Sequence, residues 1–254
     1  MTKQGFVYSW GNGEEGILGH GDVKSYNTPK RLDSLRDLDV RSVVCGGLHT
    51  LALTRNGHIY SWGKGEGGQL GLPFDQLVKN TERNQLYCMA PRRIKGALEH
   101  KVVVQVACGD AHSLALTQDG LVFAWGYSYH GQLGLGITSE SSESMGSCQV
   151  LEPVLIDRLL NVNITDIYAG ATFSLFLSEK KELYGCGLNE SNQLGIERSV
   201  TKVTTQLERF NSSVARALDS AYPKKLDCFN SMPVLQVTCG EAHSLAVNLN
   251  FIGI

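Results

Sequence analysis

Residues 60–71 have the sequence YSWGKGEGGQLG, and this stretch decides the fold because it recurs along the chain. Residues 8–11 are YSWG, residues 123–126 are FAWG and residues 184–187 are YGCG. A Leu-Gly pair follows each copy, at residues 18–19, 70–71, 133–134 and 194–195. Four copies spaced about 50 to 60 residues apart predict a chain built from stacked repeat units.

A second block follows the first in every copy. Residues 108–116 have the sequence CGDAHSLAL, and residues 45–53 and 239–247 match it closely. Residues 169–177 match more loosely, because Ala169 and Phe173 replace the cysteine and the histidine. The order of the two blocks is the same throughout, which is strong support for a repeat.

The repeat has the composition of β-strands. Residues 58–62 and 121–125 are rich in branched and aromatic side chains, and the Asn-Gly and Asp-Gly pairs at residues 56–57 and 119–120 favour hairpin turns. A third strand precedes each second block, and a short fourth strand is expected to begin at each of Pro29, Pro91, Pro153 and Pro223. Four strands per unit predict one blade of a β-propeller, and blades must stack to bury their faces.

The paired blocks resemble the repeat of the regulator of chromosome condensation family. The resemblance extends from about residue 5 to residue 247. It implies an all-β propeller, and the members of that family have seven blades. We therefore expect a single repeat domain over residues 1–254, with four four-stranded blades forming a partial, open version of a seven-bladed ring. The expected repeats are residues 5–57, 58–120, 121–181 and 182–250.

The two ends of the chain differ. The turn at residues 2–5 matches that at residues 54–57, whereas the pattern is lost after residue 247. We hypothesise that the chain is a partial product of a longer propeller, with missing blades supplied by another chain as one possibility. An open arc would expose two apolar blade faces.

Three insertions separate the Leu-Gly pairs from the prolines. They are residues 72–90, 136–152 and 196–222; the second includes a loop rich in serine and glutamate, and the third a possible short helix at residues 214–218. Such loops either carry specificity or are tolerated surface insertions, and the sequence leaves both open.

Residues at equivalent repeat positions are expected to be structural. The tryptophans should lie between neighbouring blades, and the histidines should be packing residues because phenylalanine replaces one of them. The cysteines of the second block are expected to be small buried residues. No metal site and no cofactor are expected. The structural set is Trp10, Trp62, Trp125, His49, His112, His243, Gly46, Gly109, Gly170 and Gly240.

Composition excludes several classes of protein. With 23 Lys+Arg against 25 Asp+Glu, a formal net charge of −2 makes nucleic-acid binding an unfavoured function. The uncharged stretches are too short to span a membrane, and seven cysteines without a CxxC pair suit the cytoplasm or the nucleus. Basic pairs at residues 30–31, 92–93 and 224–225 either protect strand edges, which we favour, or bind an anionic partner.

The favoured function is a non-enzymatic scaffold that binds another protein. The alternative, implied by the family resemblance, is guanine-nucleotide exchange on a Ran-like small GTPase. The expected partner contacts lie in variable loop positions, and aromatic residues there are typical of interfaces. They are Lys64, Glu66, Asp110, Tyr127, Tyr129, His130 and Glu241.

Overall fold

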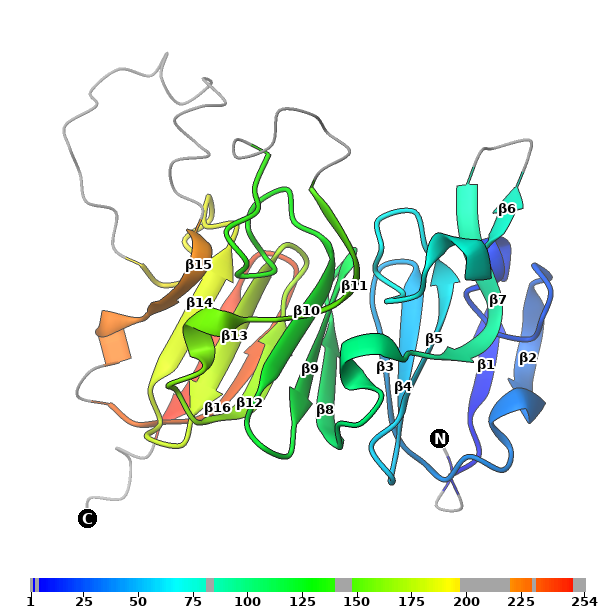
Figure 1. Ribbon diagram of the computed structural model, residues 1–254, viewed down its shortest axis with the longest axis horizontal. Helices are drawn as coiled ribbons and strands as arrows, with labels where there is room; N and C mark the ends of the chain where they lie inside the picture. Colours follow the sequence, from blue (N-terminus) through cyan, green and yellow to red (C-terminus); the bar gives the residue numbers. More distant parts are fainter. Residues whose placement is uncertain are drawn as a thin grey trace.

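The computed structural model describes residues 2, 5–80, 85–139, 148–196, 220–229 and 232–248. These residues form 17 strands, and all helices among them are short 3-10 turns. The strands make five separate antiparallel sheets that stand side by side (Figure 1). The expected all-β propeller is confirmed.

Three sheets are complete blades. Their orders are β3-β4-β5-β7-β6, β8-β9-β10-β11 and β12-β13-β14-β15; the last two blades are simple up-and-down meanders, and in the first β6 adds outside β7. The strands are β3 (Val40–Cys45), β4 (His49–Thr54), β5 (Ile59–Lys64), β6 (Val78–Asn80), β7 (Gln85–Arg93), β8 (Val103–Cys108), β9 (His112–Thr117), β10 (Val122–Tyr127), β11 (Gln149–Leu155), β12 (Ile164–Ala169), β13 (Phe173–Ser178), β14 (Leu183–Gly187) and β15 (Ser220–Lys225).

The first and last sheets have two strands each. The first pairs β1 (Tyr8–Gly11) with β2 (Tyr26–Arg31), and the last pairs β16 (Val234–Cys239) with β17 (Ser244–Asn248). The four repeats thus supply four blades' worth of strands, distributed as three whole blades and two halves. The sequence repeat begins at the third strand of a blade, so its boundaries divide the terminal blades. Figure 1 shows β1 and β16 at opposite sides of the molecule.

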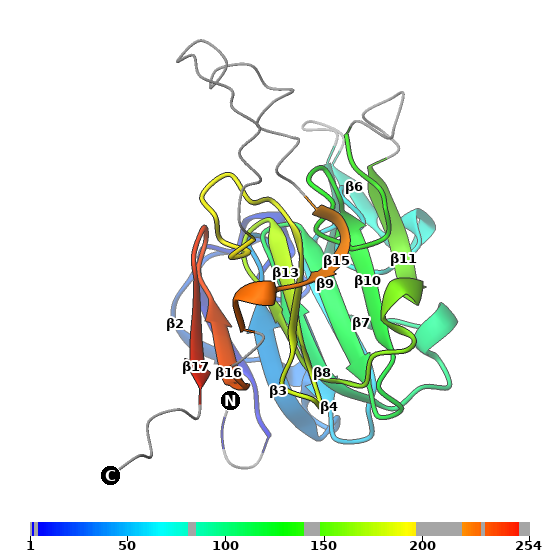
Figure 2. The ribbon, with the colours of Figure 1, turned by 90° about the vertical axis from the view of Figure 1, so that its left-hand side faces the viewer.

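Short 3-10 helices connect the strands. Most follow the outer strand of a blade and lead to the first strand of the next, while η1 and η3 lie in other loops. They are η1 (Glu14–Gly16), η2 (Asp33–Leu35), η3 (Phe74–Gln76), η4 (Gly96–Leu98), η6 (Asp157–Leu159) and η8 (Asp227–Phe229). Figure 2 shows the sheets from the side of β16 and β17.

The outer strands begin before their prolines, which corrects the expected start of the fourth strand. In the first sheet Ser9 pairs with Lys30, while Gly11 pairs with Tyr26, so the outer strand has extra residues opposite Trp10. The register shifts at the same place in the three complete blades. A proline has no N–H for the ladder and is tolerated at a bulge in an outer strand.

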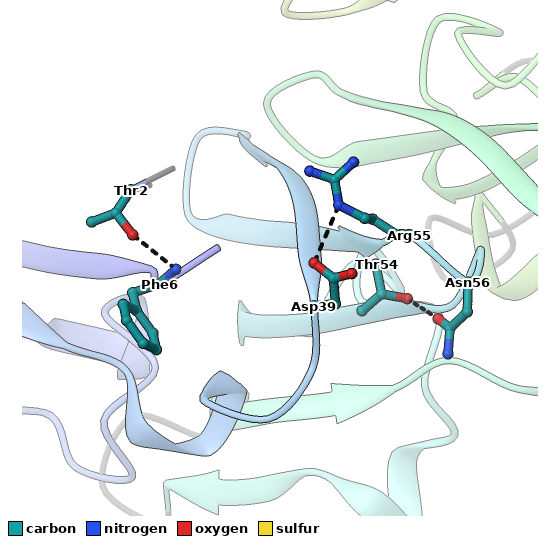
Figure 3. A network of polar contacts seen from close by, with 6 residues as sticks. All are labelled: Thr2, Phe6, Asp39, Thr54, Arg55 and Asn56. Atoms are coloured by element: carbon teal, nitrogen blue, oxygen red, sulfur yellow. Dashed lines mark hydrogen bonds and ion pairs between the residues drawn. The ribbon is translucent and has the colours of Figure 1, made fainter. Parts of the chain in front are cut away.

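The hairpin between the second and third strands is fastened by a hydroxyl group. The Thr54 Oγ1 accepts a 3.0 Å hydrogen bond from the His58 N–H, and Thr54 also bonds to Asn56 (Figure 3). Thr117 and Ser178 accept equivalent bonds at 3.1 Å. The Thr2 Oγ1 accepts one at 3.2 Å from the Phe6 N–H, so the first turn of the chain follows the repeat.

The hydrophobic core lies between the blades. Leu51 and Leu53 of β4 pack against Trp125 of the next blade, and Leu114 and Leu116 of β9 pack against Phe176 and Cys186. The core is therefore a series of interfaces between neighbouring sheets, as a stacked repeat requires.

The insertions are described only in part. The first contains η3 and β6, and β6 pairs with β7 to widen its blade. The serine-rich loop from residue 140 and the helix expected at residues 214–218 lie outside the described residues.

Candidate protein-interaction face

Two sets of loops meet at one end of the blades. The loop after each Trp-Gly pair bonds through its backbone to the loop before the second strand: the Lys64 N–H donates to the Leu48 carbonyl at 2.8 Å, and the Tyr127 N–H donates to the Ala111 carbonyl at 2.8 Å. We call this end the loop face, defined by residues 46–48, 64–68, 109–111, 127–131, 170–172 and 240–242. All seven expected contact residues lie on it.

Three of them form an aromatic cluster. The rings of Tyr127 and Tyr129 are stacked with centroids 6.2 Å apart, and Tyr129 meets His130 edge to face at 5.1 Å. All three side chains are half-buried. Partial burial raises the pKa of the Tyr127 hydroxyl, with smaller effects from Cys148 and Tyr129. The phenol therefore stays neutral and is available as a hydrogen-bond donor.

A charged group lies beside this cluster. The Lys64 Nζ is 3.2 Å from a Glu66 carboxylate oxygen and 3.9 Å from a Glu15 oxygen. A Cβ placed on Gly67 would be 3.6 Å from the Cβ of Tyr127, so the backbone of the charged loop lies close to the aromatic loop. Sequence reasoning missed Glu15, whose second oxygen is buried without a hydrogen-bond partner among the described residues.

The remaining two expected contact residues line an axial hollow of about 340 Å³. Asp110 and Glu241 come from two repeats that are not adjacent in sequence, and both are exposed. Backbone bonds tie the loops together around the hollow: the Gly47 N–H donates to the Asp110 carbonyl at 3.2 Å, and the Asp110 N–H donates to the Ala171 carbonyl at 3.0 Å. The hollow thus has a rigid backbone wall and two carboxylates.

One expectation about the cysteines is wrong. Cys45 is exposed, and Cys108 and Cys239 are half-buried: all three line the axial hollow, while Cys108 and Cys239 also pack against the hydrophobic clusters between blades. No disulfide joins the cysteines of the described residues. Desolvation raises the pKa of the Cys239 thiol to about 12, so this thiol is protonated and is a poor nucleophile.

Glutamines hold the loop face in shape. The Gln69 side-chain oxygen accepts a 2.8 Å bond from the Gly67 N–H, and Gln132 and Gln193 accept equivalent bonds at 2.9 Å. These side chains are buried. The repeated Gln-Leu-Gly signal could have identified them, because a glutamine recurring in an apolar context needs a fixed partner.

The repeat histidines lie between blades. The His49 Nε2 is 2.9 Å from the Ser113 Oγ of the next blade, and Ser113 donates at 2.8 Å to the Gln69 carbonyl. Because the only hydroxyl proton is used on that carbonyl, His49 must donate through Nε2. His112 and Ser174 repeat the arrangement at 3.0 Å, whereas His243 is exposed.

Glycine three residues before each ring makes space for it. A Cβ on Gly46 or Gly109 would overlap the ring of His49 or His112. The same overlap would arise between Gly170 and Phe173, and between Gly240 and His243. The ring position accepts histidine or phenylalanine because the glycine clears room for a flat group.

The tryptophans divide into two kinds. Trp62 and Trp125 are buried between blades, and their indole N–H groups donate to the carbonyls of Ile17 at 2.9 Å and Gln69 at 3.0 Å. Trp10 is 57% exposed, because among the described residues no strand pairs with the free edge of β1.

The basic pairs lie on outer strands. Arg31 bonds to Asp33 at 2.8 Å and Lys225 to Glu182 at 2.8 Å, in β2 and β15 respectively. In the described part of the chain, no three His, Cys, Asp or Glu side chains are grouped as metal ligands would be. In that same part, no helix has the length and apolar character needed to cross a membrane.

Several known proteins are similar to this chain. It is 38% identical over 197 residues to the human E3 ubiquitin-protein ligase HERC2, covering 77% of this chain and 4% of that protein. It is 38% identical over 191 residues to the Arabidopsis thaliana ultraviolet-B receptor UVR8, covering 75% and 39%. The chain thus spans a minor part of these curated relatives.

Solved structures share the fold. The crystal structure of human WBSCR16 superposes with a TM-score of 0.73 at 24% identity, covering 98% of this chain and 56% of that one. Yeast RCC1 (Prp20), solved bound to Kap60, superposes with a TM-score of 0.73 at 21% identity, covering 97% and 51%. Residues 1–250 match the family of the RCC1-like domain. By its repeats, its blades and this match, the chain belongs to the RCC1-like domain family.

Proposed function

We propose that this chain is a non-enzymatic scaffold whose loop face binds another protein. The observation that carries the proposal is the aromatic cluster (Tyr127, Tyr129 and His130), with the loop that carries the charged group around Lys64 close beside it. Half-buried tyrosines with a charged rim have the composition of a protein interface, where aromatic anchors supply most of the binding energy.

The rigidity of the face supports this role. The loops are tied to each other through backbone bonds, and Gln69 and Gln132 brace them from within. A face that is already ordered loses little conformational entropy on binding. Placement in the cytoplasm or nucleus belongs to the same proposal.

Exchange on a small GTPase is the second candidate. The yeast relative Prp20p, solved as a crystal structure, has binding properties to Gsp1p and histones, and it superposes on this chain with a TM-score of 0.72 at 21% identity. The axial hollow with Asp110 and Glu241 is the feature that favours exchange here, because two carboxylates can compete for a bound Mg²⁺ or contact a basic loop.

The scaffold proposal is tested by comparative capture. Wild-type chain and a Tyr127→Ala/Tyr129→Ala variant are used as baits, and recovered proteins are quantified by mass spectrometry. A partner that depends on the cluster should drop roughly tenfold or more with the variant. Tyr222→Ala is the matched control, because Tyr222 is an exposed tyrosine on the outer strand β15. Equal recovery by wild type and the double variant would contradict the proposal.

Exchange is tested by release of a fluorescent guanine nucleotide from a Ran-like GTPase. Acceleration that is lost with Asp110→Asn/Glu241→Gln would favour the second candidate. Unchanged release, together with a partner lost on tyrosine removal, leaves the scaffold as the function.

A further inference from the structure

The first and last sheets each hold half of a blade, and the two halves are different. In the complete blades the second strand pairs with the third, as β4 does with β5, β9 with β10 and β13 with β14. The last sheet ends in a second strand, β17, and the first sheet begins with a third strand, β1. Among the described residues neither has a partner on its other side. Their free edges are therefore complementary in type.

A hollow of about 250 Å³ lies between the last two sheets. In the matching place two blades earlier, the space is filled by Trp125, surrounded by Leu51, Ile59, Leu70, Val106 and Ala115. The wall of the hollow has the same repeat positions: Leu175, Leu183, Leu194, Val237 and Ala246. The hollow has the lining of a tryptophan site without the tryptophan.

A polar group of this hollow matches as well. The Gln69 carbonyl accepts from both the Ser113 hydroxyl at 2.8 Å and the Trp125 indole at 3.0 Å. At the matching position, the Gln193 carbonyl accepts from the Ser244 hydroxyl at 2.8 Å. A carbonyl oxygen has two lone pairs, so the second can receive an indole N–H.

A second hollow, of about 420 Å³, lies beside β1 and is lined by Val7, Leu18, Val43 and Trp62 among others. In the next interface the matching space receives Leu51 and Leu53 from the preceding blade. The equivalent residues of the last sheet are Leu245 and Val247, whose exposed fractions are 62% and 57%. Each end of the molecule therefore carries the side chains that the other end lacks.

We propose that two copies of this chain associate head to tail, with β1 of one copy adding to β17 of the other. The strands β16-β17-β1-β2 then form a complete blade across the two copies. Trp10 enters the hollow beside β17, while Leu245 and Val247 enter the hollow beside β1. Addition of a strand to a free sheet edge supplies backbone hydrogen bonds, and the side chains set the register.

The complete blades fix that register. Leu51 faces Ser61 and Ala52 faces Tyr60 in the pairing of β4 with β5, so Leu245 should face Ser9 and Ala246 should face Tyr8. A second copy is the occupant because the same polypeptide presents both halves. One copy does not join its own ends, since β1 and β16 lie at opposite sides of the molecule (Figure 1). The assembly either closes into a ring or extends, as head-to-tail contacts do. This inference does not depend on the proposed function.

Solution mass gives the first test. By light scattering after size exclusion, wild type should exceed the 27.7 kDa of one chain and increase in mass with concentration. Trp10→Ala removes the entering side chain, and Leu245→Asp places a charge where the receiving hollow is apolar. Each should weaken association on the order of 30-fold. Both residues are exposed in the single copy, so folding should survive, which circular dichroism verifies. Leu160→Asp is the control, because Leu160 is 50% exposed and lies at neither end.

Mixing the two variants gives the sharper test. The Trp10→Ala variant keeps the β17 end intact, and the Leu245→Asp variant keeps the β1 end intact. These two intact ends can join, so an equimolar mixture should form a one-to-one pair that cannot extend. A mixture that stays monomeric, or association that neither variant weakens, would overturn the proposal.

A cross-link tests the register. Copies carrying Ser9→Cys are mixed with copies carrying Leu245→Cys and oxidised, and a disulfide between residues 9 and 245 should form only in the mixture. Mass mapping separates it from links to the native cysteines. If wild type stays monomeric while a peptide of residues 5–12 binds it, the edge accepts a Trp-Gly strand from another protein, and self-association is refuted.

Discussion

Trp125 and Trp10 occupy the same position of the repeat but have opposite environments. Trp125 is buried in a complete interface between two blades, whereas Trp10 stands at the open side of a half-blade. Both tryptophans follow an aromatic and a small residue and precede a glycine, so the difference in burial comes from the neighbouring strands. A repeat position therefore has no intrinsic burial, and stability lies in the interfaces between repeats.

The largest expected difference in unfolding free energy is between the alanine variants of these two tryptophans. We expect Trp125→Ala to lower the free energy of unfolding by about 3–5 kcal/mol, because it removes a buried indole and leaves a cavity. Trp10→Ala should change it by less than about 0.5 kcal/mol in the single copy. Urea unfolding followed by far-ultraviolet circular dichroism, at concentrations that keep the chain monomeric, measures both values.

Two results would break the comparison or sharpen it. If the two variants lose the same free energy of unfolding, Trp10 is buried in the folded chain and the comparison fails. If the loss of unfolding free energy for Trp10→Ala grows with protein concentration, the comparison becomes sharper, because a second copy then buries Trp10.

Much of the fold follows from the sequence, and what escapes has a physical reason. The strands around Trp62 and His112 are predictable because each motif occurs several times and its errors average out. The sequence does not predict which strand begins a blade, because a periodic pattern has no natural starting point. The chain can be divided after Gly57, between β4 and β5, or between an outer strand and the next inner strand, and only hydrogen bonding shows which strands share a sheet.

The candidate site divides in the same way. The seven proposed contact residues could be placed on one face because their loops are repeat-equivalent. Glu15 could not be identified from the sequence, since its position in the first loop has no acidic counterpart in the other copies. The exposure of Cys45 also escaped, because a short residue beside glycine suits a tight interface and the rim of an axial hollow equally well.

Acid should weaken the inner interfaces. Burial lowers the pKa of His49 to about 4 and that of His112 to about 3, the latter aided by the charge of His49. Since the unfolded chain binds these protons near pH 6.5, it holds more protons than the folded chain below that pH. The stability contribution is thus fully present above pH 6.5 and is lost as the pH falls towards 4.

The expected slope is about 1.4 kcal/mol per pH unit for each histidine, or about 2 kcal/mol by pH 5. His112→Phe copies the natural residue Phe173 of the next repeat and should lose about 2 kcal/mol less than wild type between pH 7 and pH 5. His100→Gln, at an exposed histidine, is the control and should keep the wild-type slope. Parallel pH profiles for wild type and His112→Phe would contradict the assignment.

The smallest expected difference concerns the hairpin hydroxyls in Figure 3. Thr54 is buried in a complete blade and accepts a 3.0 Å bond from the His58 N–H, so Thr54→Ala should cost about 1 kcal/mol of unfolding free energy. Thr2 accepts a longer 3.2 Å bond at the edge of a half-blade, where water can replace the hydroxyl, and Thr2→Ala should cost less than about 0.5 kcal/mol. Arg55→Ala is the control within the same turn, because the Arg55–Asp39 pair at 3.2 Å is largely exposed and such pairs contribute little. If Arg55→Ala costs more than Thr54→Ala, surface charge fastens this hairpin, and the hydroxyl repeated through the four turns has another role.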